Sequence, residues 1–117
     1  MAVTLKVLPM TRERGACCPL PVTLDQAWAA DQASLLRAIA DPTRLAMLAA
    51  LQKAEHPICI CDFTGAFGLT QPTISHHIAK LRAAGLVESE RSGIWVYYRL
   101  RRNLPGRVSR VLEALLG

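Results

Sequence analysis

The stretch that decides the fold is residues 62–85, which read DFTGAFGLTQPTISHHIAKLRAAG. Phe63 and Phe67 are four residues apart, which is the spacing of one face of a short helix. Gly68 then supplies the left-handed backbone of a tight turn, and Thr70 is a suitable N-cap for a second helix. Two short helices joined by a turn that contains glycine form a helix-turn-helix.

Two strands are expected to follow this unit. Residues 86–90 and 94–100 flank a turn at residues 91–93, and the second run is rich in Trp, Val and Tyr, which favour strands. This hairpin is the wing of a winged helix-turn-helix that extends from about Asp62 to Leu100. The sequence therefore predicts a mainly α fold with a β-hairpin wing.

Helical periodicity also occurs on both sides of this unit. Residues 25–40 and 42–53 predict two helices, divided where Asp41 can cap the second one. Residues 58–61 alternate as a short extended segment, and Asp62 is the expected N-cap of the third helix. A last helix is predicted from an apolar stripe at helical spacing, formed by Leu104, Val108, Val111, Leu112 and Leu115.

Length and charge limit the class of protein. A chain of 117 residues is enough for one compact domain. It has 14 basic and nine acidic residues and a net charge of +5, which favours a polyanionic partner such as nucleic acid. We find no run near the ~20 apolar residues of a membrane span and no secretory signal. We therefore expect a cytoplasmic protein with no membrane partner.

The helix that begins near Gln71 has two different faces. Its apolar face is expected to pack in the core and comprises Ile74, Ile78 and Leu81. On the opposite face Thr73, His76 and Lys80 are candidate DNA contacts. Gln71 and Ser75, which flank the start of the helix, are candidates as well. Arg91 of the wing is a further candidate, whereas His77 lies nearer the core and favours a structural role. The alternative is an ordinary amphipathic helix with a solvated polar face.

Four cysteines in a cytosolic chain are expected to be reduced thiols and therefore candidate ligands. Cys17 and Cys18 fall within residues 1–22, where proline and glycine without a sustained period predict a flexible arm. Residues 23–117 are expected to form the DNA-binding and dimerisation domain. Cys59 and Cys61 lie where the third helix is expected to begin.

Several segments resemble the ArsR/SmtB family of metal-responsive winged-helix repressors, in particular its arsenite-responsive members. These are AIADPTRLAML (38–48), ICICD (58–62), GLTQPTISHHIAKLRAAGLV (68–87) and ERSGIWVYYRL (90–100), so the resemblance covers about residues 24–117. It implies a homodimer formed through the first and last helices. It also implies that two recognition helices bind an inverted-repeat operator in double-stranded DNA until a metal binds.

The resemblance also points to a sensing site. Cys59-x-Cys61 matches the family's CxCD metal box, while residues 99–117 lack the histidine and aspartate of a C-terminal site. Because an arm can reach across a dimer, we expect Cys17 or Cys18 of one subunit to join Cys59 and Cys61 of the other. His56 is a weaker candidate for a further ligand.

Sulfur ligands select soft ions, here As(III), Sb(III), Cd(II), Pb(II) or Zn(II). The adjacent Cys17-Cys18 pair resembles the arsenite-responsive members more than the cadmium and lead sensors, so As(III) or Sb(III) is the favoured inducer. Two alternatives stay open, a thiol-disulfide switch on the same scaffold and a nonspecific architectural DNA binder. An enzyme is not expected, because the sequence has no CxxC motif, phosphate-binding loop or nucleophile-base-acid arrangement.

Overall fold

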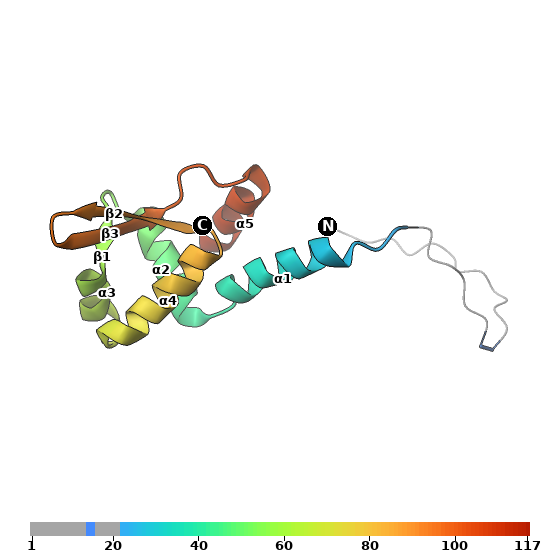
Figure 1. The fold of residues 1–117 in the computed structure, drawn as a ribbon, viewed down its shortest axis with the longest axis horizontal. Helices are drawn as coiled ribbons and strands as arrows, with labels where there is room; N and C mark the ends of the chain where they lie inside the picture. Colours follow the sequence, from blue (N-terminus) through green and yellow to red (C-terminus); the bar gives the residue numbers. More distant parts are fainter. Residues whose placement is uncertain (1–13, 16–21) are drawn as a thin grey trace.

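The computed structural model describes residues 14–15 and 22–117 (Figure 1). Most of the predicted arm, including Cys17 and Cys18, lies outside the described residues. The elements are α1 (Gln26–Ile39), α2 (Pro42–Lys53), β1 (Ile58–Cys59), α3 (Ile60–Phe67), α4 (Gln71–Ala83), β2 (Val87–Ser92), β3 (Trp95–Leu100) and α5 (Gly106–Leu116). Figure 1 shows the β2–β3 hairpin and the N-terminal end of α1 extending in opposite directions from the other helices.

Side-chain caps begin three of the helices, and those at Asp41 and Thr70 were predicted from the sequence. Asp25 accepts a hydrogen bond from the first turn of α1, and Asp41 accepts one from the backbone N–H of Arg44 in α2 at 2.9 Å. Thr70 caps α4, which has proline in its first turn. Each cap satisfies a backbone donor that the helix leaves free. The helix-turn-helix, α3 followed by α4, is therefore confirmed.

The start of α3 differs from the expectation. The N-cap is Cys59 rather than Asp62, and only residues 58–59 of the predicted extended segment form a strand. Asp62 is the third residue of the helix, and its carboxylate accepts a hydrogen bond from the Cys59 N–H at 3.1 Å. An acidic side chain at this position reaches back to the N-cap, so the helix begins three residues earlier. Gly68, with φ of 65°, ends the helix.

A three-stranded antiparallel sheet forms the wing, in the order β1-β3-β2. β1 pairs with β3, and Cys59 lies opposite Tyr97. The β2–β3 turn is at Gly93 and Ile94, where Gly93 has a φ of 62° that suits glycine. Arg91 therefore lies within β2, opposite Val96, and not in the turn as predicted. The wing itself is confirmed.

Helices and sheet share one apolar core. The predicted inner face of α4 is confirmed, since Ile74, Ile78 and Leu81 are almost completely buried. They pack in one cluster with residues of α2, α3 and the sheet, among them Met47, Leu48, Phe63 and Val87. α5 starts after Leu104 and buries Val108 and Leu112, but Val111 and Leu115 of its predicted stripe remain exposed.

Candidate nucleic-acid interface and metal centre

The outer face of α4 is free to meet a partner. Of the five predicted contact residues, Ser75 is half-buried and the others are exposed, namely Gln71, Thr73, His76 and Lys80. The hydroxyl of Thr73 lies 3.0 Å from that of the cap residue Thr70. Lys80 borders a hollow of about 330 Å³ together with Arg37 and Arg44. The exposed side of the helix therefore combines neutral donors and acceptors near its start with positive charge farther along.

Arg44 of α2 contacts α4 on the side away from its exposed face. Its guanidinium donates to the carbonyls of Ala38 and Arg37 at 2.6 and 3.1 Å. The third bond joins Nη1 to Nδ1 of His77 in α4 at 3.2 Å, which confirms the structural role predicted for His77. Asp41 lies 3.9 Å from the same ring nitrogen, and the backbone hydrogen bond from Arg44 lowers the pKa of Asp41. The end of α1 and the start of α2 are thus tied to the recognition helix.

Ion pairs brace the wing. Arg99 of β3 donates to Glu88 at 3.0 Å and to Glu90 at 2.7 Å, both in β2. The side-chain hydrogen bond from Arg99 lowers the pKa of Glu88, and the bonds to Glu90 and Glu88 raise the pKa of Arg99. Arg91, the predicted wing contact, is exposed. Arg91 therefore projects from two strands that ion pairs hold together.

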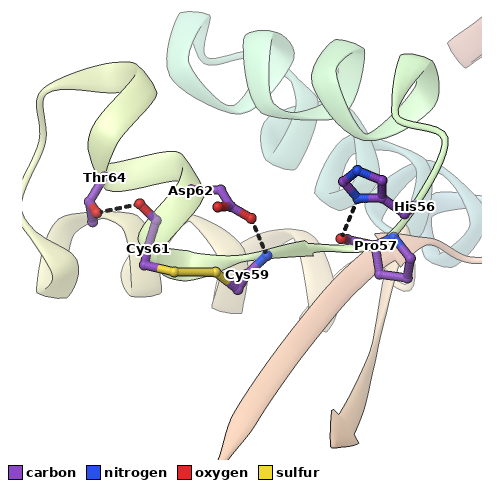
Figure 2. Close-up of a disulfide and its surroundings, with 6 residues drawn as sticks. All are labelled: His56, Pro57, Cys59, Cys61, Asp62 and Thr64. Atoms are coloured by element: carbon purple, nitrogen blue, oxygen red, sulfur yellow. Dashed lines mark hydrogen bonds between the residues drawn. A yellow bond between two sulfur atoms is a disulfide. The ribbon is translucent and has the colours of Figure 1, made fainter.

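The two cysteines at the start of α3 lie together. Their Cα atoms are 5.4 Å apart, and the structure joins them in a disulfide (Figure 2), in contrast to the expectation of free thiols. Cys59 is extended at the end of β1 and Cys61 lies in the first helical turn, so both sulfurs reach the same side. Cys59 is buried and Cys61 is exposed. Cys61 is therefore the member of the pair that solvent reaches more readily.

Asp62 completes a potential metal site. One ligand atom each of Cys59, Cys61 and Asp62 lies within 4.8 Å of the other two, the one such group of three within residues 14–15 and 22–117. The sequence predicts only a capping role for Asp62, although the CxCD spacing puts its carboxylate next to the two thiols. His56 is not part of this group, and its ring nitrogen Nδ1 bonds to the carbonyl of Pro57 at 3.2 Å (Figure 2).

A helix-turn-helix followed by a β-hairpin wing is the fold of winged-helix transcriptional regulators. Comparison with known proteins agrees with this class. Residues 41–89 match the family described as "Bacterial regulatory protein, arsR family". The structure is similar to that of NolR from Sinorhizobium fredii, with a TM-score of 0.69 and 30% identity, covering 83% of this chain and 93% of NolR.

Two curated relatives are linked by name to arsenic. The chain is 39% identical over 82 residues to the arsenic resistance transcriptional regulator ArsR1 of Pseudomonas putida, a match that spans 70% of this chain and 63% of that protein. It is 35% identical over 79 residues to the arsenical resistance operon repressor of Escherichia coli, spanning 68% of this chain and 67% of the repressor.

The chain belongs to the ArsR family of DNA-binding transcriptional regulators. The matched proteins are regulators, which confirms the prediction that this chain is not an enzyme. Within the described part of the chain, none of the helices is both long enough and apolar enough to cross a membrane.

Proposed function

We propose that this chain is a metalloid-responsive repressor in the cytoplasm. As an apo homodimer it binds an inverted-repeat operator, and it leaves the DNA when As(III) or Sb(III) binds its cysteine thiolates. The observation that carries the proposal is the cluster of Cys59, Cys61 and Asp62 at the start of α3, the helix that packs against α4. The names of the two relatives support arsenic as the signal.

DNA recognition is assigned to the exposed side of α4 and to the wing. The start of α4 enters the major groove, where Gln71 can pair with adenine through two hydrogen bonds. Thr73, Ser75 and His76 offer further donors and acceptors to base edges or phosphates. Lys80 and Arg91 bind phosphates.

The dimer is supported by apolar side chains that the single chain leaves uncovered. Trp28 and Leu36 of α1 are 55% and 56% exposed, and Val111 and Leu115 of α5 are 40% and 58% exposed. Both helices lie toward the end of the molecule away from the wing (Figure 1). A two-fold dimer that pairs these helices buries the exposed surface and presents two recognition helices to an inverted repeat.

Ligand binding requires the reduced cysteines. Reduction of the disulfide takes two electrons and two protons from a thiol reductant and frees both sulfurs. Two sulfurs that each bind one tetrahedral ion at about 2.3 Å lie about 3.8 Å apart. The two sulfur atoms must therefore move apart after the disulfide bond is broken. Cys17 or Cys18 of the other subunit then supplies the third thiolate that pyramidal As(III) needs. Cd(II), Pb(II) and Zn(II) are the alternative ions.

Release from DNA tests this function. An operator duplex is first selected from random inverted repeats with the reduced protein, and arsenite, antimonite, cadmium, lead and zinc are then titrated against the complex. Cys59→Ser and Cys61→Ser should retain operator binding and lose release by arsenite. Cys17→Ser and Cys18→Ser, made in parallel, show which arm thiol takes part. If arsenite still releases the operator from Cys59→Ser and Cys61→Ser, the proposal is contradicted. If these variants no longer bind the operator, the cysteine pair has a structural role.

A second candidate function is a thiol-disulfide switch, which the Cys59–Cys61 disulfide favours. In that case oxidation of the pair, without any metalloid, changes the operator affinity. The two functions are distinguished by measuring operator affinity of the reduced and oxidised proteins in the absence of arsenite. The metalloid proposal requires release by arsenite under full reduction, whereas the redox switch requires release on oxidation alone.

A further inference from the structure

Each end of the recognition helix α4 borders a hollow. The hollow beside the cysteines measures about 320 Å³ and is lined by the start of α3, by Gln71 at the start of α4, and by Ile94, Trp95 and Val96 of the wing. It borders the candidate metal centre. The second hollow, of about 330 Å³, lies between the end of α4 and the helices α1 and α2. We call it the basic hollow, because three cationic side chains line it.

The lining of the basic hollow carries positive charge from three helices. Arg37 comes from the last turn of α1, Arg44 from α2 and Lys80 from the last turn of α4. None of the lining residues is acidic, and Asp41, whose carboxylate accepts a hydrogen bond from the Arg44 N–H, is not among them. Cations that converge in this way form a site for an anion. The other lining residues are small and leave space for it, namely Ser34, Ala38, Ala83 and Ala84.

Arg44 is preorganised for such an anion. A guanidinium has five N–H donors, and the bonds to Ala38, Arg37 and His77 occupy three of them within the described part of the chain. Because Arg44 is half-buried, these bonds fix the direction of its other donors. Arg37 and Lys80 are exposed and reach the anion from the solvent side. One fixed cation and two exposed ones suit a ligand that stays partly in solvent, as the phosphate of a macromolecule does.

The basic hollow also lies in line with the proposed DNA contacts. Thr73, His76 and Lys80 recur at i, i+3 and i+7, so they form one stripe that leads along α4 to the hollow. Gln71 and Lys80 are nine residues apart, which is about 14 Å along the helix axis. The major groove is about 12 Å wide. When the start of α4 meets base edges, the hollow therefore lies at the border of the groove, where the phosphates are.

We propose that the basic hollow binds one phosphate of the operator backbone. Arg37, Arg44 and Lys80 neutralise this phosphate together, and the Ser34 hydroxyl donates a further hydrogen bond. This inference rests on the proposed function and extends the DNA contact surface from α4 to α1. Because α1 also carries apolar side chains proposed for the dimer interface, a shift of α1 against α4 changes the phosphate site and with it the DNA affinity.

Arg37→Gln tests the contribution of α1. The substitution removes the charge but keeps the Arg37 carbonyl that Arg44 binds. Because a phosphate contact carries no sequence information, binding to the operator and to scrambled DNA should weaken alike, about tenfold for each subunit. Arg37→Lys retains the charge and should keep most of the affinity. Fluorescence anisotropy measures each affinity, and circular dichroism verifies folding.

Arg82→Gln is the matched control. Arg82 is an exposed arginine on α4 and is not part of the lining of the basic hollow. It follows Lys80 by two residues and therefore projects about 200° around the helix from it. The substitution removes the same charge and should leave DNA affinity nearly unchanged. Equal losses in Arg37→Gln and Arg82→Gln would reduce the effect to net charge and overturn the inference.

Uncharged phosphate analogues identify the phosphate itself. In a series of operator duplexes, one phosphate at a time in each half-site is replaced by a neutral methylphosphonate. One position should weaken wild-type binding, and Arg37→Gln and Lys80→Gln should both be much less sensitive to that position, since each has already lost part of the contact. Arg82→Gln should keep the sensitivity of wild type. Full sensitivity of Arg37→Gln at every position, or insensitivity of the two variants at different positions, would overturn the inference.

A free phosphate anion is the other source of this chemistry. Binding of inorganic phosphate to the DNA-free protein is measured by calorimetry at constant ionic strength. Tight binding that Arg37→Gln abolishes, with DNA affinity unchanged, would assign the hollow to a small anion and overturn the inference.

Arsenite separates this inference from the proposed function. Arsenite should still release the operator from Arg37→Gln, because the cysteines are intact. If wild type keeps its operator in arsenite while the methylphosphonate pattern is as expected, the proposed inducer is wrong and the phosphate site stands. If the reduced wild type binds no inverted repeat, both fail.

Discussion

Arg44 of α2 is hydrogen bonded to His77 of α4, with 3.2 Å between Nη1 and Nδ1. Arginine has no acceptor, so the guanidinium donates and Nδ1 of His77 accepts, which places the proton of the neutral ring on Nε2. The same guanidinium binds two carbonyls at the end of α1. Arg44 thus connects the helix proposed for dimerisation to the helix proposed for DNA recognition.

Replacing Arg44 should weaken both stability and DNA binding. Arg44→Met keeps an apolar stem but removes the three side-chain bonds, and the free energy of unfolding should fall by about 2 kcal/mol. Operator affinity should also fall, because α4 loses its support. Urea unfolding at fixed protein concentration and operator titration measure the two effects. Arg37→Met removes the same charge from an exposed side chain and should have little effect on stability; equal losses of stability in both variants would exclude the positioning role of Arg44.

The cap residue Asp41 gives a pH-dependent contribution to stability. Asp41→Ala should lower the free energy of unfolding by about 1 kcal/mol at pH 7. Because the pKa of Asp41 is lowered in the folded protein, its contribution is complete above the unfolded value of about 3.9 and disappears as the pH falls through the folded value. The difference from wild type should therefore shrink in acid. Asp41→Asn, which keeps an acceptor for the cap, should be nearly as stable as wild type at pH 7; a large loss would contradict the capping role.

Gln71 is expected to contact a base and Lys80 a phosphate, so their alanine variants should weaken DNA binding in different ways. Gln71→Ala should weaken operator binding by about tenfold while leaving the salt dependence unchanged. Lys80→Ala should weaken operator and scrambled DNA alike, and the slope of log affinity against log salt should fall by about 0.9. Fluorescence anisotropy at several salt concentrations measures both. An unchanged slope for Lys80→Ala would show that this side chain contacts no phosphate.

A charge on the exposed face of α5 should separate the subunits. Val111→Asp places a carboxylate among apolar side chains in the proposed interface, and the dimer should dissociate at concentrations where wild type does not. Analytical ultracentrifugation gives the mass of each species. Ile94→Asp adds the same charge to an exposed apolar position on the wing and should leave the dimer intact. Equal masses of wild type and Val111→Asp would remove α5 from the interface.

Local signals in the sequence were sufficient for most of the fold. The Gly68 turn, the Thr70 cap and the apolar face with Ile74 and Ile78 each involve residues close in the chain, and the structure contains all of them. The predicted start of α3 at Asp62 was wrong because Cys59 is the N-cap and Asp62, three residues later, forms a capping box with it. An acidic residue near a helix start suits both the N-cap and the third helical position, so the sequence pattern alone does not decide between them.

Contacts between residues far apart in the chain could not be predicted from the sequence. The Arg44–His77 bond spans 33 residues, and nothing in the periodicity of either helix indicates it. The hollow beside the cysteines combines residues of α3, α4 and the wing, so it exists only in the folded chain. Cys59 and Cys61 were recognised as a pair, but their covalent state depends on redox conditions that the amino-acid sequence does not encode.

The hollow beside the cysteines has a consequence for how this regulator can evolve. Its wall contains Ile94 and Trp95, which also form the turn and the first residue of β3 in the wing. A substitution that widens or narrows the hollow therefore also reshapes the hairpin that is proposed to contact the operator. Selection for a new chemical signal and selection for an unchanged DNA site act on the same few side chains, so the two properties cannot drift independently.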